Sequence, residues 1–170
     1  MSGAVDARSS EAILAIVRRV TLVILVLAMG GIFVELLLTE HFADVWQLIP
    51  LVLLGLGLPL VAWHTRARSV SSARTLRALM TLFVLSGLLG VFLHYRGNVE
   101  FELEQNPRAT RWALFRDAMM GATPALAPGV MVQIGLLGLL YVFVSGTARR
   151  RQGAESAKGA RGARGARGAD

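Results

Sequence analysis

The sequence VTLVILVLAMGGIFVELLL, residues 20–38, decides the fold class of this chain. It is apolar except for the hydroxyl of Thr21 and the carboxylate of Glu35, and it is long enough to cross a bilayer as a helix, which takes roughly 17 to 25 residues. A backbone in hydrocarbon must satisfy its own hydrogen bonds, so a helix is the expected structure. The segment is too long for the apolar core of a signal peptide, and we expect it to be retained.

Three more apolar blocks follow, at residues 48–63, 78–95 and 128–145. The 170-residue chain is 54% hydrophobic and its mean hydropathy is +0.56, which is too apolar for an ordinary soluble domain. The blocks also lack the polar face that a helix of a soluble bundle presents to water. We therefore expect an all-α integral membrane protein, with four transmembrane helices in one domain over residues 1–148.

The basic residues are distributed unevenly between the two sides of such a bundle. Fourteen precede the first block, lie between the second and third, or follow the fourth, and the opposite side has only four, Arg96, Arg108, Arg111 and Arg116. Because basic residues collect in cytoplasmic loops, this bias predicts that both termini are cytoplasmic. The net charge of +7 then reflects topology and attraction to anionic lipid headgroups, and we expect no nucleic-acid binding.

The composition also indicates a tail and a source. Residues 149–170 are basic and end in KGARGARGARGAD, which predicts a disordered cytoplasmic tail. Every basic residue except Lys158 is arginine, and Ala, Gly, Leu and Val are abundant, as is typical of a high-GC bacterial genome. We therefore expect a multi-pass protein of the bacterial inner membrane.

The loop between the third and fourth blocks is the largest segment outside the membrane. Apolar and acidic residues alternate over residues 99–104, VEFELE, which predicts an extended segment. Asn106 and Pro107 are typical of a helix start. After them, Trp112, Phe115 and Met119 share one face at helical spacing. The loop is thus predicted to contain a short amphipathic helix on the outer membrane surface.

The two halves of the chain resemble each other. GIFVE at residues 31–35 parallels GVFLH at 90–94, and residues 50–63 align without a gap to 128–141, with a proline at the start of each. These matches suggest a tandem hairpin repeat of residues 12–64 and 75–147. Since both hairpins would start on the same side, the pseudo-two-fold axis would lie along the membrane normal.

Glycines recur inside all four blocks without a phosphate-loop pattern. At hydrocarbon depth, small residues let helix backbones approach each other closely. We therefore expect these glycines to mark helix contacts, namely Gly30, Gly31, Gly55, Gly57, Gly87, Gly90, Gly135 and Gly138.

Four polar residues are predicted to lie near one another at the outer ends of the spans: Glu35, His94, Gln133 and, slightly above them, His41. The first three fall within about 8 Å of each other along the membrane normal at the helical rise per residue. A carboxylate within a span is costly, so we expect Glu35 to face the bundle and contact His94 or Gln133. The cluster could be a structural clasp or a site for a cation, proton or polar ligand, unless Glu35 extends outward to water. His64, at the inner end of the second block, is interpreted as an interface residue.

No pattern of catalytic residues is found in the chain, which also has no cysteine. We expect no enzyme activity, no cofactor and no metal site. The leading hypothesis is a non-enzymatic accessory, assembly or scaffold subunit whose helix packing and outer loop are its working surfaces. The alternative is a small transporter or membrane sensor that uses the site around Glu35 and His94. Because four spans rarely enclose a pore, transport would imply a homodimer or a larger membrane complex.

Overall fold

The computed structural model describes residues 2–121 and 124–146, and within these ranges the chain forms five helices. They are α1 (Ser2–Leu38), α2 (Val45–Ala67), α3 (Val70–Gln105), α4 (Arg111–Met119) and a fifth helix at Gly129–Gly146. All except α4 are long and apolar enough to cross a membrane. The predicted all-α fold with four membrane-spanning helices is therefore confirmed, while the predicted tail, residues 149–170, lies outside the described residues.

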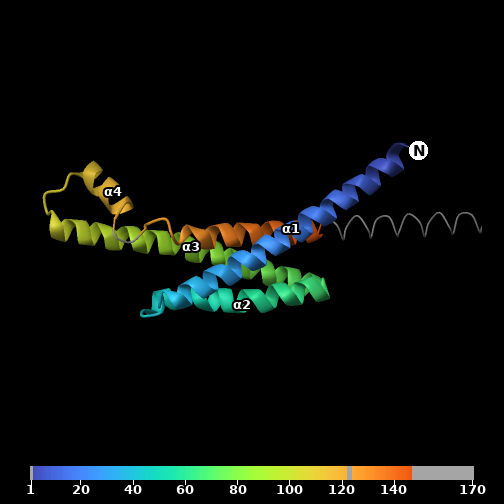
Figure 1. Ribbon diagram of the computed structural model, residues 1–170, viewed down its shortest axis with the longest axis horizontal. Helices are drawn as coiled ribbons and strands as arrows, with labels where there is room; N and C mark the ends of the chain where they lie inside the picture. Colours follow the sequence, from blue (N-terminus) through green and yellow to red (C-terminus); the bar gives the residue numbers. More distant parts are fainter. Residues whose placement is uncertain (1, 122–123, 147–170) are drawn as a thin grey trace, which may run out of the picture.

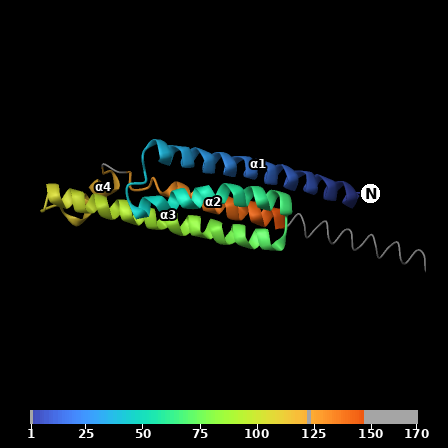
Figure 2. The same ribbon diagram turned by 90° about the horizontal axis from the view of Figure 1, so that it is seen from below.

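The long helices run up and down along one axis (Figure 1). The N-terminus of α1, the turn between α2 and α3 and the end of the fifth helix lie at one end, which we call the inner end, and α4 lies at the other, the outer end. The helix α1 crosses the other three obliquely, and its N-terminal part projects beyond them (Figures 1 and 2). Two views thus agree with the up-and-down threading expected for consecutive hairpins.

The core lies where all four long helices meet. Its fully buried side chains come from each of them: Leu25 and Met29, Leu54, Met80 and Phe83, and Ile134. Burial differs among the helices, because 17% of the most apolar part of α1 is buried against 39% of the fifth helix. Most of α1 is therefore available to lipid.

Glycine allows α3 and the fifth helix to touch backbone to backbone. A Cβ at Gly135 would lie 2.7 Å from the carbonyl oxygen of Met80, and one at Gly87 would lie 2.7 Å from the backbone nitrogen of Val132. Neither backbone group can move aside cheaply, so both sites exclude a side chain. The predicted role of glycine in helix contacts is confirmed at Gly57, Gly87, Gly90, Gly135 and Gly138, but is wrong at Gly30 and Gly31, where a Cβ would meet open space.

The helix α3 is longer than expected, because residues 99–104 continue it instead of forming an extended segment. Extending an existing helix avoids the cost of a new nucleus, and an (i, i+4) ion pair between Arg96 and Glu100, 2.8 Å, spans this part. Asn106 caps the end of α3, with its N–H donating to the carbonyl of Glu102. The predicted helix start at Asn106 and Pro107 is therefore wrong, and α4 begins at Arg111.

Candidate functional site

Two of the four predicted site residues meet at the outer end of the bundle. The ring centroids of His41 and His94 are 6.3 Å apart, and the rings are tilted by 51°. Nδ1 of His94 also lies 3.4 Å from the carbonyl oxygen of Pro124, to which it donates when it carries the proton. This pair, the outer histidine pair, therefore joins three segments: the loop after α1, the helix α3 and the segment after α4.

A helix-ending motif holds His41 in place. Glu40 adopts a left-handed conformation with φ of 52°, which turns the chain after α1. The N–H of His41 donates to the carbonyl of Leu36, 2.9 Å, and the N–H of Glu40 donates to that of Leu37, 3.2 Å. These two bonds have the pattern of a Schellman motif, and they fix the direction in which the chain leaves the helix.

Burial lowers the pKa of His41 below its ordinary value of 6.5, and the nearby imidazole of His94 lowers it further when protonated. Both effects act against the charged form of His41. At neutral pH the outer histidine pair therefore favours a neutral imidazole at position 41, and acidification places like charges beside each other.

The other two predicted residues do not join this pair. The side chains of Glu35 and Gln133 are exposed, and neither forms a hydrogen bond or an ion pair with the part of the chain that the structure describes. The expected inward orientation of Glu35 is wrong because Glu35 does not lie on the face of α1 that packs on the core. The stripe of α1 that packs on the core runs through Leu25, Met29 and Leu36, and Glu35 lies one position, about 100°, around the helix from Leu36.

A polar cluster that the sequence analysis missed lies at the inner end. His64 is 2% exposed, and its Nδ1 is 2.9 Å from Oγ of Ser72, across the turn between α2 and α3. The ring of Tyr141, from the fifth helix, meets the His64 ring edge-on at a centroid distance of 5.8 Å. His64 is thus buried within the bundle at the inner end of α2, and its expected position at the membrane interface stays a prediction.

The hydroxyl of Ser72 uses its full bonding capacity. It donates to the carbonyl of Ser69, 3.0 Å, and accepts from the Ser69 N–H, 3.1 Å, while the Ser72 N–H donates to Oγ of Ser69. This capping box starts α3. When the hydroxyl proton is given to Ser69, His64 must donate from Nδ1, which assigns its tautomer. A serine pair three residues apart, shortly after a histidine that ends a span, is the sequence signal that could have identified this cluster.

Beyond the outer histidine pair, α3 and α4 form a unit that we call the outer arm, residues 96–119. Asn98 is 4% exposed, and its amide donates to the carbonyl of Ala118, 2.8 Å. A Cβ at Gly121 would lie 2.9 Å from the Asn98 side chain, so the chain after α4 closes tightly on Asn98. A buried, hydrogen-bonded amide makes this contact specific.

The helix α4 divides its side chains between two surfaces. Ala118 is buried against α3, whereas the rings of Trp112 and Phe115 stack on each other at 5.6 Å and are 74% and 43% exposed. The outer arm therefore presents an aromatic patch, Trp112 and Phe115, on a helix that is itself docked.

The described residues contain no group of three or more His, Cys, Asp or Glu side chains that could hold a metal ion. The outer histidine pair supplies two imidazoles, which is fewer than the three protein ligands of a typical catalytic zinc site. Comparisons with protein-family models, curated proteins and solved structures found no match to this chain.

Proposed function

We propose that this chain is a non-enzymatic accessory or scaffold subunit of the bacterial inner membrane, with both termini in the cytoplasm. The observation that carries the proposal is the outer arm. A loop that only connected two spans would not need a buried amide bond such as that from Asn98 to Ala118. The outer arm is built around this bond, and it leaves the Trp112–Phe115 patch exposed.

Aromatic side chains on a rigid support are typical of protein interfaces, because they bury a large area at a low cost in conformational entropy. In the proposal, the Trp112–Phe115 patch is the contact surface for another membrane protein, and the four spans hold that surface at a set height above the bilayer.

Site-specific photo-crosslinking in intact cells tests the scaffold role. A photoreactive residue at Trp112 should give one discrete protein adduct, and the same residue at Leu27, which is 69% exposed within α1, should give none. Loss of the adduct on Phe115→Ser, with unchanged protein level, would assign the contact to the patch. Lipid adducts alone at position 112 would show that the patch lies on the membrane surface and would refute the scaffold role.

The orientation rests on the charge bias, and the chain suits a labelling test because it has no native cysteine. With both termini inside, Glu102→Cys should react with a membrane-impermeant maleimide in intact cells, and Val70→Cys should stay protected until the cells are opened. The reverse pattern would refute this orientation.

The outer histidine pair favours a second candidate, a small membrane sensor or transporter. It joins three outer segments through two imidazoles, and charging His41 is opposed by burial and by His94, which is the arrangement a proton-responsive element needs. A spin label on α4 should then move on acidification in the native protein and stay in place in His41→Gln. Identical movement in both proteins would exclude the pair as the sensor.

A further inference from the structure

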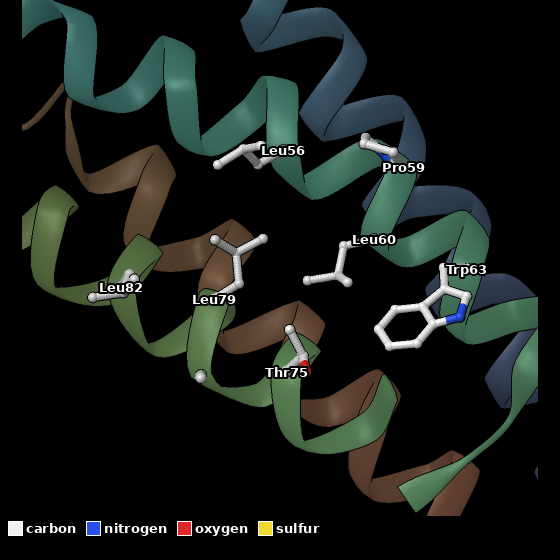
Figure 3. Close-up of a pocket in the computed structure, with 8 residues that line it drawn as sticks. Leu56, Pro59, Leu60, Trp63, Thr75, Leu79 and Leu82 are labelled. Atoms are coloured by element: carbon white, nitrogen blue, oxygen red, sulfur yellow. The ribbon is translucent and has the colours of Figure 1, made fainter. Parts of the chain in front are cut away.

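An apolar groove of about 520 Å³ runs between α2 and α3 at the inner end of the bundle (Figure 3). On α2 its walls are Leu56, Pro59, Leu60 and Trp63, and on α3 they are Thr75, Ala78, Leu79 and Leu82. The side chains of Leu60 and Leu79 point between the two helices, and the indole of Trp63 lies at one end (Figure 3). The groove therefore opens sideways from the bundle.

The groove has the length and direction of part of one acyl chain. It extends over seven helical steps on each wall, which is about 10 Å at the rise of an α-helix. One leaflet contributes about 15 Å of hydrocarbon to a bilayer core of about 30 Å. Since the helices cross the membrane, a groove between them runs along the direction of the lipid tails and covers about two thirds of one leaflet.

The lining favours a hydrocarbon chain over a protein segment. The lining contains two polar groups, the hydroxyl of Thr75, which donates to the carbonyl of Ser71, 3.1 Å, and the indole N–H of Trp63 at one end of the groove. The rest of the lining is hydrocarbon, as suits a lipid tail, whose binding needs shape and apolar contact.

The inner mouth of the groove is cationic. Below Trp63, the end of α2, the turn and the start of α3 carry Arg66, Arg68, Arg74 and Arg77, all exposed, and residues 64–77 contain no acidic residue. Tryptophan commonly lies at the boundary between hydrocarbon and headgroups, which places the guanidinium groups of Arg66, Arg68 and Arg74 at phosphate depth. Arginine binds phosphate through several N–H groups at once.

We propose that the groove between α2 and α3 is a binding site for an anionic phospholipid. One acyl chain fills the space between Leu56 and Trp63, and the headgroup phosphate lies among the arginines of the turn. This inference depends neither on the scaffold role nor on the orientation of the chain, because it can be tested in vesicles that carry the same lipid in both leaflets.

Trp63 is a built-in reporter of the occupant. In a protein with Trp46→Phe and Trp112→Phe, all tryptophan fluorescence comes from Trp63, which is 44% exposed. Bromine atoms on a lipid tail quench a tryptophan that they touch. In mixed vesicles, brominated phosphatidylglycerol should occupy the site about fivefold more strongly than brominated phosphatidylcholine, the preference that one basic side chain near the surface provides. Equal quenching by the two lipids would refute the proposal.

A matched pair of double variants separates a site from a general surface charge. Arg66→Gln with Arg74→Gln should remove the preference, whereas Arg18→Gln with Arg19→Gln, on α1 and with the same loss of charge, should keep it. The single-tryptophan protein that retains Trp46 is a second control, since Trp46 lies at the outer end of α2 and should show no such preference. If both double variants lose the preference equally, there is no localised site.

Filling the groove provides a test that does not depend on charge. Ala78→Phe adds a ring to the α3 wall at an exposed position, so the core stays intact. Quenching of Trp63 by brominated phosphatidylglycerol should fall to the level seen with brominated phosphatidylcholine. In the protein without Ala78→Phe, quenching of Trp63 by both lipids is followed as the protein concentration rises. If quenching by both lipids is lost, a second copy of the chain fills the groove and the lipid proposal is wrong.

Discussion

His64 and His94 lie at opposite ends of the same bundle and have opposite surroundings. His64 is almost completely buried, with Ser72 on one side and the ring of Tyr141 on another. His94 is partly exposed and lies beside His41, a group that acquires the same charge. The inner histidine is therefore held by a polar network, whereas the outer one lies beside a second imidazole, His41, whose charged form it disfavours.

The lengths of the connections account for this difference. Only Arg68 and Ser69 separate α2 from α3, so the two helices must meet at the inner end, and the capping box of α3 falls next to His64. At the outer end, residues 39–44 connect α1 to α2, and a longer stretch that includes α4 leads to the fifth helix. A short turn forces burial, and longer connections leave polar side chains partly exposed.

The largest expected effect is at the inner end. Ser72→Ala should lower the free energy of unfolding by about 2 kcal/mol, because it removes the hydrogen bond between Ser72 and Nδ1 of buried His64 and breaks half of the capping box. SDS titration of the protein in mixed micelles measures this. Ser71→Ala, one position away and exposed, should stay within about 0.5 kcal/mol of the native protein. Equal effects of the two substitutions would contradict the network.

The next effect tests whether the outer half also depends on a buried polar bond. Asn98→Ala should cost about 1 to 2 kcal/mol, and the cost should be local, because the bond from Asn98 to Ala118 lies at the junction of α3 and α4. Hydrogen exchange of the amides of residues 111–119 should accelerate while the spans stay protected. Arg96→Ala, which removes an exposed ion pair, is the control and should change little.

Acid should weaken the outer end. Since the pKa of His41 lies below 6.5 in the folded protein, the unfolded chain binds protons first as the pH falls. The contribution of His41 to the free energy of unfolding should therefore be constant above about pH 6.5 and decrease below it. His41→Gln should remove this decrease. A pH profile unchanged by His41→Gln would show that burial and His94 do not act on this residue.

The smallest effect is expected at Glu35. Its side chain is exposed and has no hydrogen-bond or ion-pair partner among the described residues, so Glu35→Gln should change the free energy of unfolding by less than about 0.5 kcal/mol. A loss above about 1.5 kcal/mol, dependent on protein concentration, would mean that a second copy of the chain covers Glu35.

The candidate site was predicted in part. His41 and His94 were expected at similar depth because depth follows from counting residues along a helix, and they do meet. Glu35 was expected to join them on the same count, but depth does not specify which face of α1 meets the core. The tandem repeat stays a prediction. One aligned pair differs in its surroundings, because Trp63 is 44% exposed and lines the groove between α2 and α3, whereas Tyr141 is buried against His64.

The four spans, their approximate limits and the up-and-down threading could be read from the amino-acid sequence, because hydropathy and length are local properties of each segment. The exposure of Glu35, the burial of His64 and the docking of α4 on Asn98 were decided only by the tertiary structure. They depend on the crossing angle of α1, on the two-residue turn between α2 and α3 and on the continuation of α3 beyond the apolar block. The crossing angle of α1 is set by contacts between segments that are distant in sequence, where hydropathy along the chain carries no information. The turn and the length of α3 are local, but they depend on the capping box and on an (i, i+4) ion pair, which hydropathy does not describe either.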